Sequence, residues 1–369
     1  MGATVVESEL GGLRWLVVRG DRESALRALG RAAADEVRSV LGSLPEAAGL
    51  RQYAASTAGR RAVAGVLKAT RTSHAQELRE AVALAEGAGV DPEELLLANL
   101  RGDLGGDDGV GCSDLAFRGK RSFVAHNEDG APELAGRFML VTLAIDGEAP
   151  VAVQWYPGFL PCNTFVVTGH GLVWGINHIQ VAAPATAAGR HFVARGLQRQ
   201  PNLEAAVRYL TDHPSAGGFA YNIGELGTGR VVSVETAAGR HAAVETDPGS
   251  LSWHTNHLRH VESRKEAAQS GSGGTQGARN LGQREESLAR ARVLDSLEAP
   301  AGGPDTDWFL GVLAGKPVPD GVFRSAVDGD PLLTLCTSVV DLTAREVTLQ
   351  PRGAAPLTIS ADALVAADA

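Results

Sequence analysis

The most informative part of the chain lies between Gly111-Cys112-Ser113 and His126-Asn127-Glu128-Asp129-Gly130. Residues 112–117 and 122–127 alternate or run apolar like two short strands, and the turn residues Gly119-Lys120 separate them. This pattern predicts a β-hairpin that begins at the cysteine. The hairpin brings Cys112 close to the end of the second strand, where Asp129 can reach its amine or thiol.

The residues before the cysteine predict an exposed loop, because Gly102 to Gly109 are rich in glycine and aspartate. If the bond between Gly111 and Cys112 is cut, the new α-amino group lies on the same residue as the thiol. An α-amine has a pKa of about 8 and can accept the thiol proton at neutral pH. One residue then supplies both nucleophile and base. The alternative is a buried cysteine that acts as a small hydrophobic side chain.

The residues upstream of this loop predict mainly helices. Asp21 can cap a helix that continues to Leu41. Ser73 and Gln76 have the spacing of a capping box for a further helix, and Asp91-Pro92 has the pattern of a helix start. Downstream of residue 112 most segments are short strand candidates separated by turns. We therefore expect an α+β layered architecture rather than a doubly wound parallel sheet.

Composition excludes several classes of protein. The 369 residues are 44% hydrophobic with a formal net charge of -9, enough for one large domain or two ordinary ones. An acidic chain without a basic stripe argues against nucleic acid as a partner. No apolar run is long enough to span a membrane, and no secretory signal is visible. Three widely spaced cysteines do not form a disulfide framework, so we expect a cytoplasmic protein.

Six motifs together resemble the cysteine branch of the N-terminal-nucleophile hydrolases, and within it the acyl-coenzyme A:6-aminopenicillanic acid acyltransferase-like group. They occur in the same order as in that group and with similar gaps, and together they cover nearly the whole chain. The motifs are the approach at 85–100, Gly111-Cys112-Ser113, His126-Asn127-Glu128-Asp129, Trp174-Gly175-Ile176-Asn177, Thr255-Asn256-His257, and the segment from Thr334 to Asp341.

The resemblance implies a four-layer αββα sandwich made as an inactive precursor. The precursor cuts itself between Gly111 and Cys112, and residues 1–111 and 112–369 stay together as one domain. Cys112 is then the nucleophile, Asp129 holds the α-amine, and Asn256 donates to the oxyanion. Asp129 can also be read as an ordinary turn acid, and Asn256 as a polar residue at a strand end.

The resemblance assigns supporting roles to four further residues. Asn177 matches an asparagine beside the scissile bond, although a hairpin asparagine fits the pattern nearly as well. Thr334 lies near a hydroxyl-bearing pocket position, where a core threonine is the simpler interpretation. Asn127 precedes the acidic pair of its motif. His126 stands where the bile-salt-hydrolase relatives have arginine, which leaves open what stabilises the thiolate from that side.

These expectations favour hydrolysis of a small N-acyl or N-aminoacyl amine through a Cys112 thioester, in natural-product metabolism. The alternative is an acyltransferase, for which acyl-coenzyme A is an open co-substrate. A second alternative is a non-catalytic metal-binding protein built on His254, His257 and His260. We expect no cofactor and no bound metal. The expected partners are a small amide and the cleaved N-terminal fragment, without nucleic acid or membrane, and a homo-oligomer stays open.

Overall fold

The computed structural model of the chain describes residues 2–105, 111–261, 275–327 and 330–366. Their strands form two sheets, in which neighbours pair antiparallel except for the parallel pair β2 and β5. The nine-stranded sheet has the order β1 (Thr4–Leu10), β2 (Leu13–Gly20), β5 (Met139–Ile145), β6 (Val151–Trp155), β7 (Val166–Thr168), β8 (Leu172–Ile179), β9 (Gly218–Glu225), β10 (Val231–Ala237) and β11 (Arg240–Glu245). The six-stranded sheet has the order β12 (Leu251–His254), β3 (Ser113–Phe117), β4 (Phe123–Gly130), β13 (Leu333–Asp341), β14 (Glu346–Pro351) and β15 (Leu357–Ser360).

The helices of the described residues fall into three groups along the chain. Six precede the cysteine, two lie between β8 and β9, and the others follow β12. They are α1 (Arg22–Ala32), α2 (Ala34–Ser43), α3 (Ala47–Ala55), α4 (Thr57–Ser73), α5 (Ala75–Ala88), α6 (Pro92–Asn99), α7 (Arg190–Leu197), α8 (Leu203–Asp212), α9 (Thr275–Asp295), α10 (Thr306–Leu313) and α11 (Ala361–Val365), with a 3-10 turn at Pro132–Leu134. None of them is long and apolar enough to cross a membrane.

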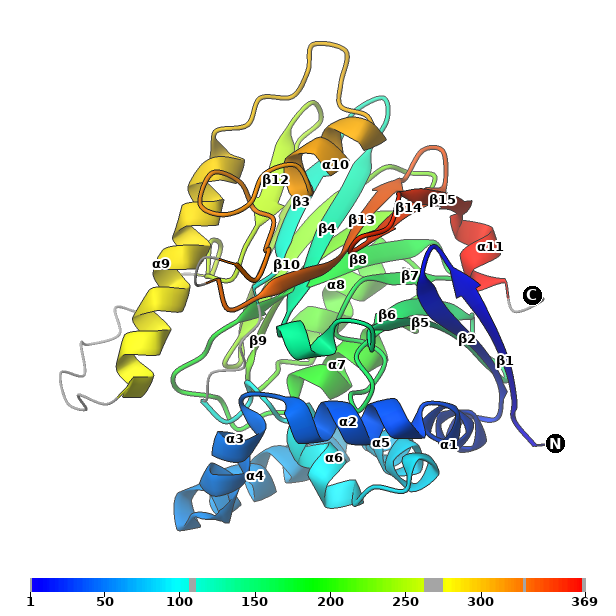
Figure 1. The fold of residues 1–369 in the computed structure, drawn as a ribbon, viewed down its shortest axis with the longest axis vertical. Coiled ribbons are helices and arrows are strands. Elements are labelled where there is room, and N and C mark those ends of the chain that lie inside the picture. The colour runs from blue at the N-terminus through cyan, green and yellow to red at the C-terminus, as the bar shows by residue number, and fades with distance from the viewer. Residues whose placement is uncertain (1, 106–110, 262–274, 328–329, 367–369) are drawn as a thin grey trace.

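Three hydrophobic cores define four layers. The central core joins the two sheets, for example Val17 and Val173 of the nine-stranded sheet with Val340 of the other. A second core packs α1, α5, α7 and α8 onto the outer face of the nine-stranded sheet. A third packs α9 and α10 onto the outer face of the six-stranded sheet. Figure 1 shows α1 to α6 on one side of the sheets and α9 and α10 on the other. The predicted αββα sandwich is confirmed.

Close packing between helices explains two glycines of the first layer. A Cβ added at Gly30 of α1 would lie 2.2 Å from the Leu84 carbonyl oxygen of α5. A Cβ at Gly87 of α5 would lie 2.0 Å from the Arg27 carbonyl oxygen of α1. The two backbones therefore touch where glycine leaves room for them.

Some predicted elements are confirmed and others are wrong. Asp91 caps α6, accepting from the Glu93 amide at 2.9 Å. The helix predicted to continue from Asp21 to Leu41 is two helices, because the backbone leaves helical geometry at Ala33 (φ -119°). The Ser73 capping box is wrong: Ser73 is the last residue of α4, and its hydroxyl contacts Ala69 and His74 instead of capping α5.

Candidate active site

The hairpin register gathers four functional side chains on one face of the six-stranded sheet. Ser113 pairs with Asn127 and Asp114 with His126. Successive residues of a strand point to opposite faces, so Asp114, His126 and Glu128 share the face that the cysteine next to Ser113 also occupies. We call Cys112, Asp114, His126 and Glu128 the Cys112 cluster. All four are buried between the two sheets.

The thiol contacts the side chains of Glu128 and His126. Cys112 Sγ lies 3.8 Å from Glu128 Oε1 and 3.9 Å from the Asp129 carbonyl oxygen. Tyr156 at the end of β6 donates its hydroxyl to the same Glu128 Oε1 at 2.6 Å. Burial and the charge of Glu128 raise the pKa of the Cys112 thiol to about 12. In the intact chain the sulfur is therefore a protonated thiol at neutral pH.

His126 lies between two carboxylates. Its Nδ1 is 2.7 Å from Asp114 Oδ1 and its Nε2 is 2.9 Å from Glu128 Oε2. Burial alone would lower the His126 pKa, but Asp114 outweighs it and the pKa rises well above the usual value. A ring that donates from both nitrogens is an imidazolium. His126 thus places a buried positive charge next to Glu128 in the Cys112 cluster.

Gly175 of β8 explains why the Trp174-Gly175-Ile176-Asn177 motif contains glycine. A Cβ at this position would lie 2.4 Å from His126 Nδ1 and 2.5 Å from Asp114 Oδ1. The absence of a side chain lets the nine-stranded sheet close over the His126–Asp114 pair. Asn222 of β9 also donates its amide to Asp114 Oδ2.

Asp129 lies on the opposite face of β4 from Glu128. Thr334 of β13 donates to Asp129 Oδ1 at 2.6 Å, while Oδ2 has no hydrogen-bond partner among the described residues. Burial raises the Asp129 pKa to about 7, against the opposing effect of Arg324 and Arg290. The structure thus brings Thr334 to Asp129. The unsatisfied Oδ2 of Asp129 belongs to the residue directly after Glu128, which lies opposite Cys112.

Asn256 reaches the cysteine through an arginine that the sequence did not single out. Arg290 of α9 donates to the Cys112 carbonyl oxygen at 2.6 Å, to Ser113 Oγ at 2.8 Å and to Asn256 Oδ1 at 2.6 Å. The Asn256 amide nitrogen donates to the His178 carbonyl oxygen at 3.0 Å. Arg290 therefore links the Asn256 side chain to the cysteine backbone from the side of α9.

Arg324 adds a second cation on this side. A Cβ at Gly111 would lie 3.3 Å from Arg324 Nη1 and 3.7 Å from Arg290 Nη2, so both guanidinium groups lie beside the residue preceding the cysteine. Arg324 Nε also binds Asp330 at 2.8 Å, and its backbone amide donates to Thr334 at 2.8 Å.

Asn127 and Asn177 make contacts away from the thiol. Asn127 donates to the Leu313 carbonyl oxygen at 2.7 Å and accepts from Thr337 at 2.6 Å, so it joins α10 and β13 to β4. Asn177 Nδ2 lies 3.3 Å from His254 Nδ1, and its Oδ1 has no hydrogen-bond partner in the described residues. No contact of either side chain with Cys112 occurs in the described part of the structure.

The three histidines near the end of β12 do not form a metal centre in the described residues. Glu235 of β10 lies 2.9 Å from His254 Nε2. Glu235 also accepts the backbone amides of Arg259, His260 and Val261. The buried hydrogen bond between His254 and Glu235, together with these three amides, therefore holds the chain after β12, which is a structural role.

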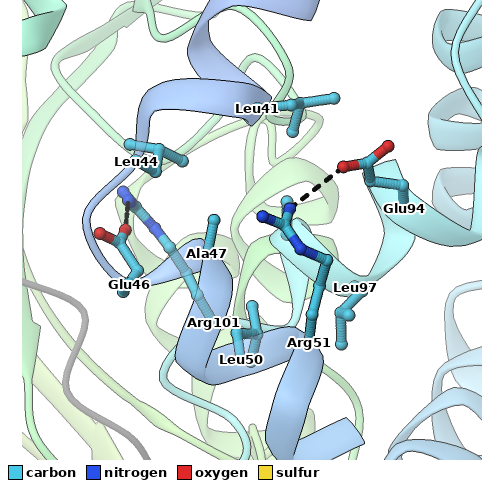
Figure 2. Close-up of a pocket in the computed structure, with 10 residues that line it drawn as sticks. Leu41, Leu44, Glu46, Ala47, Leu50, Arg51, Glu94, Leu97 and Arg101 are labelled. Carbon is cyan, nitrogen blue, oxygen red and sulfur yellow. Dashed lines mark hydrogen bonds and ion pairs between the residues drawn. The ribbon is translucent and has the colours of Figure 1, made fainter. Parts of the chain in front are cut away.

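Two surface pockets lie outside the Cys112 cluster. Figure 2 shows one between α2, α3 and α6, where Arg101 binds Glu46 at 2.9 Å and Arg51 binds Glu94 at 3.2 Å. A larger one of about 600 Å³ lies between β1, β2 and β13. No residue of the Cys112 cluster lines either of them, so neither is the catalytic site.

Asp114, Glu128, Arg290 and Arg324 are the candidate site residues that the sequence argument missed. Alternation along the hairpin could have found the first two, because a turn at Gly119-Lys120 places Glu128 opposite Cys112 and His126 opposite Asp114. The two arginines come from α9 and from the loop before β13. No spacing in the sequence connects those segments to the cysteine.

A four-layer αββα fold in which an inner strand begins beside a buried cysteine is the arrangement of the N-terminal-nucleophile hydrolases. Residues 117–301, half of the chain, match the family described as acyl-coenzyme A:6-aminopenicillanic acid acyl-transferase, and the chain belongs to this family. The matched segment contains Asp129, Asn256 and Arg290. It begins five residues after Cys112 and ends before Thr334.

One similar protein is the β-alanyl-dopamine/carcinine hydrolase of Drosophila melanogaster, 28% identical over 180 residues. The match covers 42% of this chain and 46% of that protein, so the chain spans about half the length of its relative. Among solved structures, a variant of conjugated bile acid hydrolase from Clostridium perfringens has a TM-score of 0.43 at 11% identity, over 69% of this chain and 94% of that one. Penicillin V acylase from Agrobacterium tumefaciens has a TM-score of 0.39 at 11% identity, over 68% of this chain and 86% of that one.

Proposed function

We propose that the protein is a self-processing amidohydrolase that cleaves a small N-acyl or N-aminoacyl amine through a thioester on Cys112. The observation that carries the proposal is the position of this thiol. It lies directly before β3, an inner strand of the six-stranded sheet, in contact with Glu128, while Arg290 binds the carbonyl oxygen of the same residue. Nucleophile, proton acceptor and cations thus converge on the junction between residues 111 and 112.

The first step is cleavage of the chain. Cys112 Sγ attacks the Gly111 carbonyl carbon, and the C–N bond breaks to leave a thioester on sulfur and a free α-amine. Water then hydrolyses the thioester and releases the Gly111 carboxylate. Arg290 and Arg324 lie beside Gly111 and can stabilise the negative charge that develops on its carbonyl oxygen.

Glu128 is the group that accepts the thiol proton in this first step. The α-amine of the mature enzyme does not yet exist, and Glu128 Oε1 is 3.8 Å from Cys112 Sγ. Tyr156 and His126 hold the two carboxylate oxygens in place. His126, as an imidazolium, stabilises the thiolate that forms when the proton passes from the sulfur to Glu128, and the net charge of the cluster does not change.

The mature enzyme then uses the α-amine of Cys112 as base and afterwards as acid toward the leaving amine. The free Oδ2 of Asp129 is the acceptor that this amine requires, since Thr334 already occupies Oδ1. Asn256 supplies an amide for the oxyanion of the substrate. Loss of one such donor typically costs about 3 kcal/mol of transition-state stabilisation.

The substrate class follows from the relative named above, whose substrates are amides of small amines. We propose that a small amide of this kind, such as a β-alanyl amine, is hydrolysed here. The further partner is the cleaved fragment 1–111, and neither a cofactor nor a metal takes part in turnover. The described cysteines are all free thiols, which supports a reducing, cytoplasmic setting.

Acyl transfer is the second candidate function, because the family takes its description from an acyl-transferase. Transfer and hydrolysis share the thioester and differ in whether an amine or water attacks it. A panel of N-acyl amines, assayed with and without acyl-coenzyme A and a second amine, separates them. New amide in the product indicates transfer, and free acid alone indicates hydrolysis.

Two alanine variants test the central proposal. Cys112→Ala is expected to abolish chain cleavage and turnover, and an acyl adduct is expected on Cys112 of the wild type. Cys162→Ala is the matched control, because Cys162 is equally buried but contacts only the His191 carbonyl oxygen. Turnover that survives in Cys112→Ala, or that Cys162→Ala abolishes while the chain stays folded, contradicts the proposal.

A further inference from the structure

Cys112, His126 and Glu128 are arranged as metal ligands. One potential ligand atom from each, a thiol sulfur, an imidazole nitrogen and a carboxylate oxygen, lie within 4.8 Å of one another. The described residues contain no second group of three histidine, cysteine or acidic side chains this compact. The proposed function uses these residues to transfer a proton and to stabilise the thiolate. It does not use their ability to bind a metal ion.

The spacing matches a small tetrahedral ion. Zinc bonds of about 2.0–2.3 Å to nitrogen, oxygen and sulfur place neighbouring ligand atoms about 3.3–3.8 Å apart. Cys112 Sγ and Glu128 Oε1 are already 3.8 Å apart. Shifts of less than about an ångström bring the three ligand atoms around one ion.

Two of the three ligands, His126 and Glu128, also have the supporting contact that metal sites use. His126 Nδ1 faces Asp114, which leaves Nε2 for the ion, and a carboxylate behind a ligating histidine is a common arrangement. Tyr156 donates to Glu128 and orients its carboxylate. Asn222 in turn holds Asp114. Thiolate and imidazole together favour zinc and similar ions over magnesium or calcium.

We propose that Cys112, His126 and Glu128 bind one Zn²⁺ ion, or a similar thiophilic divalent cation, and that the bound ion blocks the enzyme reversibly. Binding displaces the thiol proton of Cys112 and the Nε2 proton of His126, so two protons leave for each ion bound. The sulfur then bonds to the metal and cannot attack an acyl carbon. The inhibition and the additional amine ligand of the cleaved chain rest on the proposed function, whereas the set of three side-chain ligands is independent of it.

A further ligand becomes available once the chain is cut. The α-amine of Cys112 lies two bonds from the carbon that carries the sulfur, so amine and thiolate can close a five-membered chelate ring on one ion. The proposed cleavage therefore raises the number of ligands from three to four, and the mature form is the tighter binder.

Cobalt binding tests the site without any assay of activity. Co²⁺ added to the purified chain is expected to bind once and to give the near-ultraviolet absorption of a cobalt–thiolate bond, which Zn²⁺ then abolishes. Cys112→Ala is expected to remove this absorption. Tyr156→Phe keeps all ligands and removes only the hydroxyl on Glu128, so the affinity is expected to fall about tenfold. His170→Gln with His241→Gln, two exposed histidines, is the matched control and leaves the absorption unchanged.

Three outcomes decide the inference. Cobalt–thiolate absorption that depends on Cys112, together with inhibition by Zn²⁺ that a chelator reverses, supports it. The same absorption in a protein without turnover supports the metal site and counts against the proposed function. Metal binding that Cys112→Ala leaves unchanged, or turnover that Zn²⁺ does not alter at saturating binding, overturns the inference even where the proposed function holds.

Discussion

The reactivity of Cys112 depends on which atoms surround its sulfur. In the intact chain burial and Glu128 raise the thiol pKa to about 12, and the thiolate is the reactive form. Cleavage adds an amine to the same residue, and a protonated amine beside the sulfur lowers the thiol pKa. One residue therefore changes from an inert thiol to a nucleophile when its own peptide bond breaks.

This change predicts a difference in alkylation. At neutral pH iodoacetamide is expected to modify Cys112 at least tenfold faster in the cleaved protein than in uncleaved chain. Peptide mass spectrometry of the two forms measures the rates. The buried thiol of Cys162, which hydrogen-bonds the His191 carbonyl oxygen and lies outside the Cys112 cluster, is the internal control. Equal rates at Cys112 in both forms would contradict the proposed activation.

Glu128 predicts a second effect at the scale of a single residue. Glu128→Gln keeps the size and the contact with Tyr156 but loses the proton acceptor, so chain cleavage is expected to slow by about 10²-fold or more. Time-resolved gel analysis of fresh protein measures the rate. Glu133→Gln is the control, since that acid is exposed in the turn after β4. A Glu128→Gln chain that processes at the wild-type rate would assign the proton transfer to another group.

At the scale of elements, the β3–β4 hairpin with its turn and the bulge in β13 determine where the side chains of the site lie. The register of β3 and β4 orders the Cys112 cluster, and the irregular pairing of β13 between Thr334 and Cys336 leaves Thr334 opposite Asp129. The contact of β8 with the His126–Asp114 pair depends on Gly175.

Gly175→Ala is therefore expected to separate His126 from Asp114, because the new methyl group has no space between the sheets. We expect processing to slow by at least tenfold and the free energy of unfolding to fall by about 1–3 kcal/mol. Processing rate and urea unfolding are the two readouts. Gly227→Ala, in an open turn with positive φ, separates backbone strain from this contact. Wild-type processing by Gly175→Ala would show that the His126–Asp114 pair is dispensable.

The junction of α4 and α5 predicts a pH dependence of stability. Burial lowers the pKa of His74 to about 4, and its ring contacts Tyr209 of α8 at 2.8 Å. In the unfolded chain His74 takes up a proton below a pH of about 6.5, whereas in the folded chain His74 stays neutral down to a pH of about 4. The contribution of neutral His74 to stability is complete above pH 6.5 and is lost as the pH falls. Between pH 7 and 5 the free energy of unfolding is expected to decrease by about 2 kcal/mol.

Urea unfolding at pH 7 and pH 5 measures this loss. His74→Gln retains a polar group facing Tyr209 and cannot titrate, so it is expected to lose about 2 kcal/mol less than the wild type over this range. A His213→Gln control tests the neighbouring ring, which stacks on Tyr209. Equal pH dependence in His74→Gln and in the wild type would remove His74 as the cause.

The sequence predicted the elements near the cysteine better than those far from it. The strand pattern and the Gly119-Lys120 turn located the hairpin, because these signals are local. The break at Ala33 was not predicted, since the apolar spacing continues through it and only the packing of α1 and α2 requires it. Arg290 and Arg324 were not predicted for the same reason: their place at the site is a property of the tertiary fold.

At the scale of the whole molecule, residues 1–111 are part of both sheet and core. β2 is the parallel neighbour of β5, and α1 and α5 contribute to the core under the nine-stranded sheet. A cut between residues 111 and 112 leaves all of these contacts in place. The family match covers neither segment completely, so the two-chain organisation stays a prediction.

This arrangement predicts that the two fragments stay together after cleavage. They are expected to elute as one species in native size-exclusion chromatography and to separate only in denaturant. Refolding of the isolated fragment 112–369 is expected to fail, because the first two strands of the nine-stranded sheet are missing. Dissociation of the fragments under native conditions would contradict the single-domain organisation.

The measurement that tests the account most directly is the intact mass of purified protein, combined with sequencing of any new amino terminus. The account predicts two chains, the second beginning at Cys112, and a single uncut chain for Cys112→Ala. A wild-type protein that turns over an amide substrate while its chain remains in one piece would contradict the central claim.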